Sequence, residues 1–473
     1  MPARILPVRA STDSQASNRV ARPDNRLAAV DQAVFTGQRV TQRREVMQVV
    51  WVYEHPIDFD GLRRFHQNLR RGLLGRRIER SPLPFARDRW VSDPGPSDID
   101  IATCARPRSE LSEWADECLQ LPLDPEMGPS WHLNVLPLTD GSTAVSLLIS
   151  HYVLDGLGMV AAVHDAIVGN TRDLAYPPPR SRTRLRAVGQ DVRLTVRQVP
   201  ELARAVVASV KLARTNRQDI AKSRASRAVA VRERRWDNVP DDVVLVPHVT
   251  VVVDVTQWDA RAQALGGTSK TLVAGWVAKL AEHMGRRSSG DGTVTMQLPI
   301  STRSDGDTRA NAVSFARVRI DSTQLTTDLR DARAAIRQAL ETVRKSPDES
   351  SQVASLIPFI PKRVLKRMGE LDDTMFGDYL PVFCSNLGDF GSVVCRLDGS
   401  DAEYVTGRLA GQHLTRQWLE RIDGLMTVQS WRLPDRIFVA VCAYQPGSVK
   451  TKTDLRELAA RTLSDFNLTG EID

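Results

Sequence analysis

The run Tyr176-Pro177-Pro178-Pro179 constrains the fold of this 473-residue chain more than any other feature of its sequence. Proline has no backbone N–H and fixes φ, so three consecutive prolines interrupt helices and sheets alike. The chain is also long for one hydrophobic core. We therefore expect an α/β (α+β) protein with an N-terminal subdomain at 27–175, a Pro/Arg-rich and partly helical crossover at 176–242, and a C-terminal subdomain at 243–473. Residues 1–26 are predicted to form a mobile tail.

The first half is predicted to be an α+β unit built on one sheet. Its strands are expected at residues 45–54, 131–138 and 143–149, the last two forming a hairpin across Asp140-Gly141, a strong turn signal. Its helices are expected at 27–35, from a cap at Asp58 to residue 73, from residue 109 to residue 121, and at 157–168. Residues 77–91 are expected to be irregular.

The second half is predicted to contain similar elements. A β-branched run at residues 243–255 suits a central strand. Further strands are expected at 293–300, 311–320 and 381–384, the last ending at Ser385-Asn386-Leu387-Gly388, and as a hairpin of 426–432 with 436–444. Helices are expected at 269–284 with Ser269 as the cap, 328–345, 353–368 with two proline interruptions, and 455–466. In the crossover, residues 199–212 favour a helix and residues 218–235 favour a polar, mobile segment.

The crossover carries most of the positive charge. Residues 180–235 contain sixteen Lys and Arg and four Asp and Glu, whereas the formal net charge of the whole chain is +7. Such a segment could attract the phosphates of coenzyme A, an acidic carrier protein or anionic lipid headgroups, or it could be only a solvated helical face. Because no zinc-finger or helix-turn-helix pattern accompanies the charge, we expect no nucleic-acid partner.

The five cysteines show no C-x-x-C spacing, so the sequence predicts neither a disulfide framework nor a zinc site. Cys118 and Cys442 lie among apolar residues and are expected to be buried. No apolar run approaches the ~20 residues that span a bilayer, and no secretory signal pattern is present. We therefore expect a cytoplasmic protein, with peripheral membrane contact as one use of residues 180–235.

The predicted strand 143–149 runs directly into Ser150-His151-Tyr152-Val153-Leu154-Asp155-Gly156. An imidazole titrates near pH ~6.5, so His151 is suited to accept and return a proton at neutral pH. Asp155 is close enough in sequence to stabilise the turn that presents the ring. Gly156 permits a close approach of the substrate or dihedral angles closed to other residues. The same pattern also fits a strand end and a helix start that carry no chemistry.

These residues resemble the His-x-x-x-Asp-Gly motif of the chloramphenicol acetyltransferase-like acyltransferase superfamily. The resemblance covers most of the chain and includes Pro299-Ile300-Ser301-Thr302-Arg303, Asn311-Ala312-Val313-Ser314 and Ser385-Asn386-Leu387-Gly388. The Pro/Arg-rich crossover is most similar to the wax ester synthase/diacylglycerol acyltransferase branch, and the Ser-Asn-Leu-Gly run to condensation domains. The resemblance implies two subdomains around a central cleft or tunnel.

The resemblance also implies roles for single residues. His151 would be the general base, and Asp155 would support the site by pairing with Arg303. Gly156 would have a backbone role. Ser385 or Asn386 would donate a hydrogen bond to the oxyanion, and Asn311 is a weaker candidate for the same task.

The implied reaction takes an acyl group from acyl-CoA or an acyl-carrier protein to a small-molecule hydroxyl or amine, with a hydroxyl acceptor favoured. Coenzyme A or phosphopantetheine is then a co-substrate, and no separate cofactor or metal is expected. Many relatives carry His-His where this chain has Ser150-His151. Ser150 is therefore expected to affect substrate choice. Two alternatives stay open: a free-standing condensation enzyme that forms an amide or ester between carrier-bound substrates, and a catalytically inactive relative that binds a carrier or a lipid.

Overall fold

The strand β6 (Thr143–Ser150) is buried at every position, so both of its faces must be covered. The computed structural model describes residues 24–215, 239–288, 291–304, 306–345, 354–366 and 381–473. Most of the expected tail and the polar segment 218–235 lie outside the described residues. The sheet that contains β6 has five strands in the order β11-β1-β6-β5-β4. They are β1 (Arg44–Tyr53), β4 (Asp100–Ile101), β5 (Trp131–Pro137), β6 and β11 (Tyr404–Gln412).

Helices cover both faces of this first sheet. On one face α3 (Leu111–Leu119) packs Trp114 and Cys118 against β1 and β6. On the other face lie α2 (Phe59–Leu69) and α4 (Gly156–Val168). As predicted, Asp58 caps α2, because its carboxylate accepts hydrogen bonds from the backbone N–H groups of residues 60 and 61.

The second sheet has seven strands in the order β14-β7-β13-β12-β10-β8-β9. They are β7 (His248–Asp254), β8 (Val294–Ser301), β9 (Val313–Ile320), β10 (Val382–Asp389), β12 (Leu425–Arg432), β13 (Arg436–Tyr444) and β14 (Glu471–Ile472). Strand β10 is parallel to β8 and β12, and the other pairs are antiparallel.

One face of the second sheet is covered by helices. They are α8 (Val255–Ala264), α9 (Ser269–His283), α10 (Arg330–Lys345) and α14 (Lys452–Asp465). Every residue of α9 from Thr271 to Ala278 is buried, because this helix lies between the sheet and the other helices. These contacts form the core of the second half.

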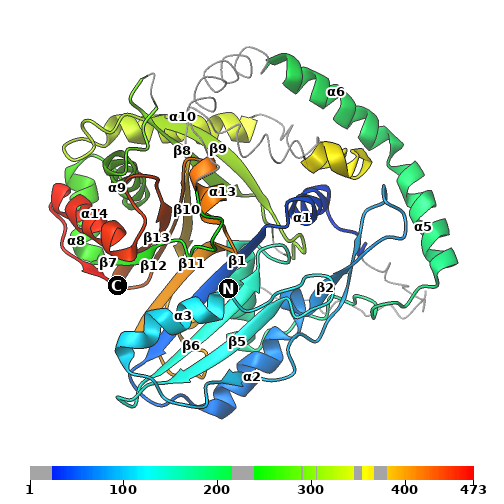
Figure 1. Ribbon diagram of the computed structural model, residues 1–473, viewed down its shortest axis with the longest axis horizontal. Coiled ribbons are helices and arrows are strands. Elements are labelled where there is room, and N and C mark those ends of the chain that lie inside the picture. The colour runs from blue at the N-terminus through cyan, green and yellow to red at the C-terminus, as the bar shows by residue number, and fades with distance from the viewer. Residues whose placement is uncertain (1–23, 216–238, 289–290, 305, 346–353, 367–380) are drawn as a thin grey trace, which may run out of the picture.

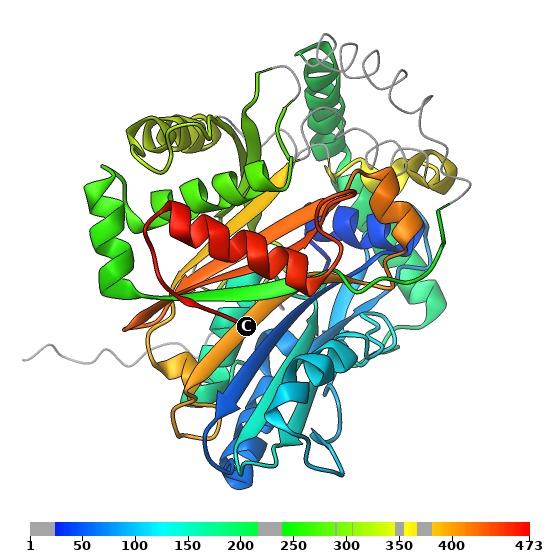
Figure 2. The ribbon, with the colours of Figure 1, turned by 60° about the vertical axis from the view of Figure 1, so that its left-hand side comes forward.

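Strand β11 joins the two halves of the molecule. It comes from the C-terminal half of the chain but pairs along its whole length with β1, from Arg44 opposite Gln412 to Val52 opposite Tyr404. Figure 2 shows the two strands side by side. The boundary expected at residue 243 therefore does not separate the two sheets, since the second half contributes an edge strand to the first.

Several expected elements differ from the structure. The strand predicted at 243–255 is shortened to β7, because Pro247 precedes it and Asp254 caps α8 through the backbone N–H of Gln257 (2.9 Å). β7 is next to the short edge strand β14 and is not central. Thr268, and not Ser269, caps α9.

Other differences concern short elements. The segment expected to be irregular contains the two-stranded pair β2 (Arg76–Glu79) and β3 (Arg89–Ser92). The helix predicted at 353–368 with two proline interruptions is interrupted as expected in its described part, which forms the turn η3 (Ile357–Phe359) and a helical piece at 362–366. Proline accounts for this break.

The basic crossover contains two helices, α5 (Arg184–Arg197) and α6 (Val199–Thr215), of which only the second was predicted. Figure 1 shows them curving around the outside of the molecule. Two of the few acidic residues in this segment hold it in place. Asp191 binds Ser81 (2.6 Å) and Arg89 (2.7 Å), and Glu201 binds Arg87 (2.9 Å). Burial acts to raise the pKa of Asp191, but the bonds from Ser81 and Arg89 outweigh it and leave the pKa lowered.

The cysteines Cys118 and Cys442 are buried, as predicted, and all five cysteines are free. Among the residues that the structure describes, no helix combines the length and apolar character needed to cross a bilayer.

His248 at the start of β7 should make stability depend on pH. Burial holds the pKa of this imidazole well below its ordinary value, and the charges of Arg408 and Lys452 lower it further. In the unfolded chain the ring takes up a proton near pH ~6.5. Acidification below that pH therefore favours the unfolded state, until the pH falls through the folded pKa.

We expect the free energy of unfolding of the wild type to fall relative to that of His248→Gln by up to about 1.4 kcal/mol per pH unit between roughly pH 6.5 and 5. Urea unfolding of both proteins at several pH values measures this difference, and His164→Gln provides an exposed control. Parallel stability curves for wild type and His248→Gln would contradict the prediction.

Candidate active site

A cavity of about 390 Å³ lies between the two sheets, and His151 lines it. The first sheet contributes residues of β1 and β11 to its wall, and the second contributes residues of β8, β9, β10 and β12. Most of the wall area is apolar, and the polar side chains that line it include Glu45, Gln48, His151, Arg408 and Gln429. A largely apolar cavity with a few polar groups is typical of small-molecule sites.

Backbone contacts fix the loop that carries His151. Strand β6 ends at Ser150, and the N–H of His151 donates to the carbonyl of Glu45 in β1 (3.0 Å). The hydroxyl of Tyr152 donates to the carbonyl of Arg43 (3.1 Å) and accepts from the N–H of Glu45 (3.3 Å). The buried guanidinium of Arg76 donates to the carbonyl of Val153 (2.8 Å). The imidazole is therefore held by its backbone. No hydrogen bond to the ring itself is found among the described residues.

Asp155 supports this loop. Its carboxylate caps α4 by accepting from the N–H of Gly158 (2.7 Å), accepts from the N–H of Ala312 (2.8 Å), and forms an ion pair with Arg303 (2.7 Å). The pair of Asp155 with Arg303 that the resemblance implied is thus present. Both side chains are largely buried. Arg303 also donates to the carbonyls of residues 307, 309 and 310, so the pair joins the His151 loop to the loop before β9.

Gly156 lies where two motifs meet. A Cβ atom at this position would lie 3.0 Å from the Cδ2 atom of Leu387 in β10, a contact tighter than most. Gly156 has no positive φ, so it is the limited space beside Leu387, and not a special backbone conformation, that favours glycine here. The close approach brings the His-x-x-x-Asp-Gly loop against the Ser-Asn-Leu-Gly segment.

Ser385 and Asn386 both line the cavity with His151. They were expected where a short strand ends, but β10 continues through them to Asp389, with a register shift against β12 between Asn386 and Gly388. The Asn386 side chain donates to the hydroxyl of Ser430 (3.0 Å) and accepts from the N–H of Gly388 (3.2 Å). The irregular strand therefore holds an amide at the cavity wall.

Asn311 does not line the cavity, which corrects the expectation that it binds substrate. Its side chain and its backbone N–H donate to the buried carboxylate of Asp31 (3.3 and 2.8 Å), in the helix α1 (Ala29–Thr41). Burial raises the pKa of Asp31, and the bonds from Ala310 and Asn311 partly oppose that rise. Asn311 therefore has a structural role.

Ser150 is likewise buried, at 2% exposure, and is not among the residues that line the cavity. Its N–H donates to the carbonyl of Ser130 (2.9 Å) as part of the strand end. Ser150 therefore has no direct contact with the cavity, and a direct role in substrate binding is not supported.

Much of the opposite wall was not predicted from the sequence. Phe383, Thr427 and Trp431 line the cavity, as does the central part of β11. The ring of Trp431 stacks on those of Phe390 and Phe438, at 6.3 and 5.3 Å between centroids. Its indole N–H is buried without a hydrogen-bond partner among the described residues. No short motif marks these positions, since only the pairing of distant strands brings them to His151.

Residues that could hold a metal ion are not grouped in this site. Within the described ranges there is no cluster of three or more His, Cys, Asp or Glu side chains suited to a metal. The polar groups at the cavity wall include the imidazole of His151, the amide of Asn386 and the hydroxyl of Ser385.

Solved structures show the same fold at low sequence identity. The first condensation domain of the calcium-dependent antibiotic synthetase is 14% identical and superposes with a TM-score of 0.54, covering 94% of this chain and 96% of that one. The wax ester synthase/diacylglycerol acyltransferase from Marinobacter aquaeolei VT8 is also 14% identical, with a TM-score of 0.52 over 94% and 98% of the two chains. The predicted fold of two chloramphenicol acetyltransferase-like subdomains is thereby confirmed.

Sequence comparisons point to the same class. Residues 61–238 match the model of the wax ester synthase/diacylglycerol acyltransferase catalytic domain. Two Mycobacterium tuberculosis proteins, from strains CDC 1551 / Oshkosh and ATCC 25618 / H37Rv, are provisionally named diacylglycerol O-acyltransferases. Each is 26% identical over 386 residues, covering 73% of this chain and 75% of the relative. These likenesses agree with the chloramphenicol acetyltransferase-like acyltransferase superfamily that the motifs of this chain resemble.

Proposed function

We propose that this protein transfers an acyl group from a thioester to a hydroxyl acceptor, with His151 as the general base. The observation that supports this most strongly is the place of His151, which lies in the wall of an apolar cavity between two sheets and is fixed by a backbone hydrogen bond to Glu45 (3.0 Å). The likeness to named wax ester synthases and diacylglycerol acyltransferases supports an oxygen acceptor.

The reaction requires one proton to move twice. The acceptor hydroxyl gives its proton to the imidazole of His151 as its oxygen bonds to the thioester carbon. The tetrahedral intermediate then collapses, the carbon–sulfur bond breaks, and the imidazolium returns the proton to the departing thiolate. The products are an ester and a free thiol, and no acyl-enzyme forms. Asp155 takes no part in this transfer, because its carboxylate is engaged by Arg303, Gly158 and Ala312.

The negative charge on the intermediate needs a donor. An amide nitrogen carries two hydrogens, and that of Asn386 uses one of them on Ser430 (3.0 Å) within the described structure. We propose that Asn386 gives the other to the oxyanion, with the Ser385 hydroxyl as a second donor. A donor that is already held in place, as Asn386 is by its bonds to Ser430 and Gly388, stabilises developing charge without reorganising during the reaction.

The donor is proposed to be acyl-coenzyme A or an acyl-carrier protein, the two thioesters that carry phosphopantetheine. Incubation of the protein with both donors and a panel of alcohols, followed by mass spectrometry of the esters, tests the proposal. Amide products formed only between carrier-bound substrates would favour the condensation enzyme instead. Binding of a thioester with no product from any pair would favour a catalytically inactive carrier- or lipid-binding protein.

We further propose that α5 and α6 bring the protein to an anionic membrane surface. Both helices expose apolar side chains, including Leu185 (88%), Val207 (69%) and Val196 (63%). Exposed arginines flank them on the same helices. Apolar side chains combined with basic ones are the features of helices that lie in a membrane interface.

The triple variant Leu185→Ser/Val196→Ser/Val207→Ser is expected to weaken binding to anionic phospholipid vesicles by roughly tenfold or more, since each apolar side chain contributes when it leaves water. Vesicle co-sedimentation measures this. Val168→Ser, an exposed residue on α4, is the control. Unchanged sedimentation of the triple variant would exclude these helices as the contact.

A further inference from the structure

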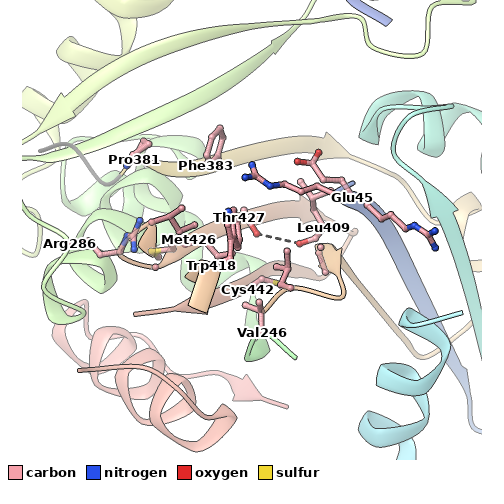
Figure 3. Close-up of a pocket in the computed structure, with 18 residues that line it drawn as sticks. Glu45, Val246, Arg286, Pro381, Phe383, Leu409, Trp418, Met426, Thr427 and Cys442 are labelled. Atoms are coloured by element: carbon pink, nitrogen blue, oxygen red, sulfur yellow. Dashed lines mark hydrogen bonds between the residues drawn. The ribbon is translucent and has the colours of Figure 1, made fainter. Parts of the chain in front are cut away.

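A second cavity, of about 240 Å³, adjoins the cavity that contains His151. The two share four wall residues, Glu45, Phe383, Leu409 and Thr427. At this shared wall the hydroxyl of Thr427 in β12 donates to the carbonyl of Leu409 in β11 (3.4 Å), which is the contact drawn as a dashed line in Figure 3. The two cavities therefore adjoin across these shared residues, on the seam between the two sheets.

The wall of the second cavity is mainly apolar, and the charged residues that line it are Arg43, Arg44, Glu45 and the buried Arg286. Figure 3 shows Arg286 at one end of the cavity and Glu45 at the other, with Met426 and Thr427 between them. Arg286 is only 2% exposed. A cation in an apolar cavity is costly unless its charge is compensated.

The backbone and one edge of the guanidinium are firmly held. Arg286 follows the C-terminus of α9, where its N–H donates to the carbonyl of Ala281 (2.8 Å). Its Nη1 atom donates to the side chain of Gln445 (2.5 Å) and to the carbonyl of Asp423 (3.4 Å). Gly424 leaves the space beside this atom, since a Cβ there would lie 3.1 Å from Nη1.

The other edge of the guanidinium is unused. Neither Nε nor Nη2 makes a hydrogen bond within the described residues, and Nε is fully buried. No carboxylate of the described residues lies within ion-pair distance of Arg286. Burial lowers the pKa of Arg286 to about 10, against the opposing charge of Asp423, so the side chain stays cationic at neutral pH. A guanidinium edge with two free donors matches the two oxygens of a carboxylate.

We propose that this cavity binds a substrate chain whose far end carries a carboxylate, and that Arg286 binds this carboxylate while the reacting end lies at His151. The inference rests on the proposed acyl transfer for the identity of the ligand as a substrate. The proposed substrate is an aliphatic chain with an anionic terminus. A purely apolar cavity would instead indicate an unsubstituted chain.

The test compares two ligands that differ by one charge. Monomethyl and dimethyl esters of α,ω-dicarboxylic acids, from adipic to dodecanedioic acid, share their chains, and only the monoesters have a free carboxylate. At the chain length that fits, isothermal titration should show the monoester binding to wild-type protein about tenfold or more tightly than the diester. Arg286→Gln should bind both equally, and Arg286→Lys should keep part of the preference. Arg337→Gln, an exposed arginine on α10, should behave as wild type.

Equal binding of the two esters by wild-type protein at every chain length, or a preference retained by folded Arg286→Gln, would overturn the inference. If Arg286→Gln does not fold, photolabelling of wild-type protein with a diazirine-bearing monoester decides instead. Labelled peptides should come from residues 416–432 or 442, and labelling confined to other regions would overturn the inference. His151→Ala should keep the preference for the monoester. A protein without acyl-transfer activity can therefore still show carboxylate binding at Arg286, and the two proposals are tested separately.

Discussion

Replacement of His151 by alanine is expected to slow acyl transfer by about 10²–10⁴-fold, the usual contribution of a general base. The variant removes the only imidazole in the cavity wall but none of the backbone bonds that hold the loop. Thioester binding should therefore change little, and the loss should fall on kcat and not on KM. Steady-state release of free thiol, with ester quantified in parallel, measures the effect.

His164→Ala is the matched control, because His164 lies on α4 near the same loop but is exposed. It should retain wild-type activity. An active His151→Ala variant, with both proteins equally stable, would show that the transfer does not depend on this imidazole.

Replacement of Asp155 by alanine is expected to lower the free energy of unfolding by about 3–5 kcal/mol. The change leaves the buried Arg303 cation without its carboxylate and removes the cap of α4. It also frees the N–H of Ala312, so the loop before β9 loses its contact with the His151 loop. Chemical denaturation followed by circular dichroism measures the loss.

Asp58→Ala separates the ion pair from the helix cap. Asp58 caps α2 in the same way but is exposed, and the nearest basic nitrogen, on Arg64, is 3.8 Å away. Removing this carboxylate should lower the free energy of unfolding by only about 1 kcal/mol, the usual contribution of a helix cap. Equal losses for Asp58→Ala and Asp155→Ala would mean that the pair of Asp155 with Arg303 adds nothing beyond capping.

Local patterns were sufficient to predict the elements that form the first sheet and its motif. The apolar run of β6, the Asp-Gly turn before it and the cap at Asp58 each depend on neighbours in sequence, and each is present in the structure. The pair of Asp155 with Arg303 was also predicted, but only from the resemblance to a family. No local pattern connects two residues so far apart.

The strand β11 could not be predicted in the same way. Its sequence, Tyr-Val-Thr-Gly-Arg-Leu-Ala-Gly-Gln, has two glycines and an arginine and lacks the alternation of a half-buried strand. β11 lacks this alternation because several of its residues line the cavity and do not pack into a core. Residues that line a cavity are not required to be large and apolar, as residues of a packed core are.

Asn311 shows that a sequence does not reveal which polar residues already have a distant partner. In the sequence it looked available for substrate, since nothing near it offers a partner. In the structure the partner is Asp31, 280 positions away, which takes both the amide and the backbone N–H. Arg286 was overlooked for the same reason, because only the packing of α9 against the end of β13 makes it a buried cation at a cavity wall.

The most direct test of acyl transfer between the two sheets measures both products of one reaction. Wild-type protein is supplied with a series of acyl-coenzyme A thioesters and an alcohol, and free thiol and ester are counted in the same sample, beside His151→Ala. We expect one thiol for each ester formed, only when the alcohol is present, and almost none from His151→Ala. Thiol released without ester, or ester formed at the same rate by wild-type protein and His151→Ala, would contradict His151-dependent acyl transfer.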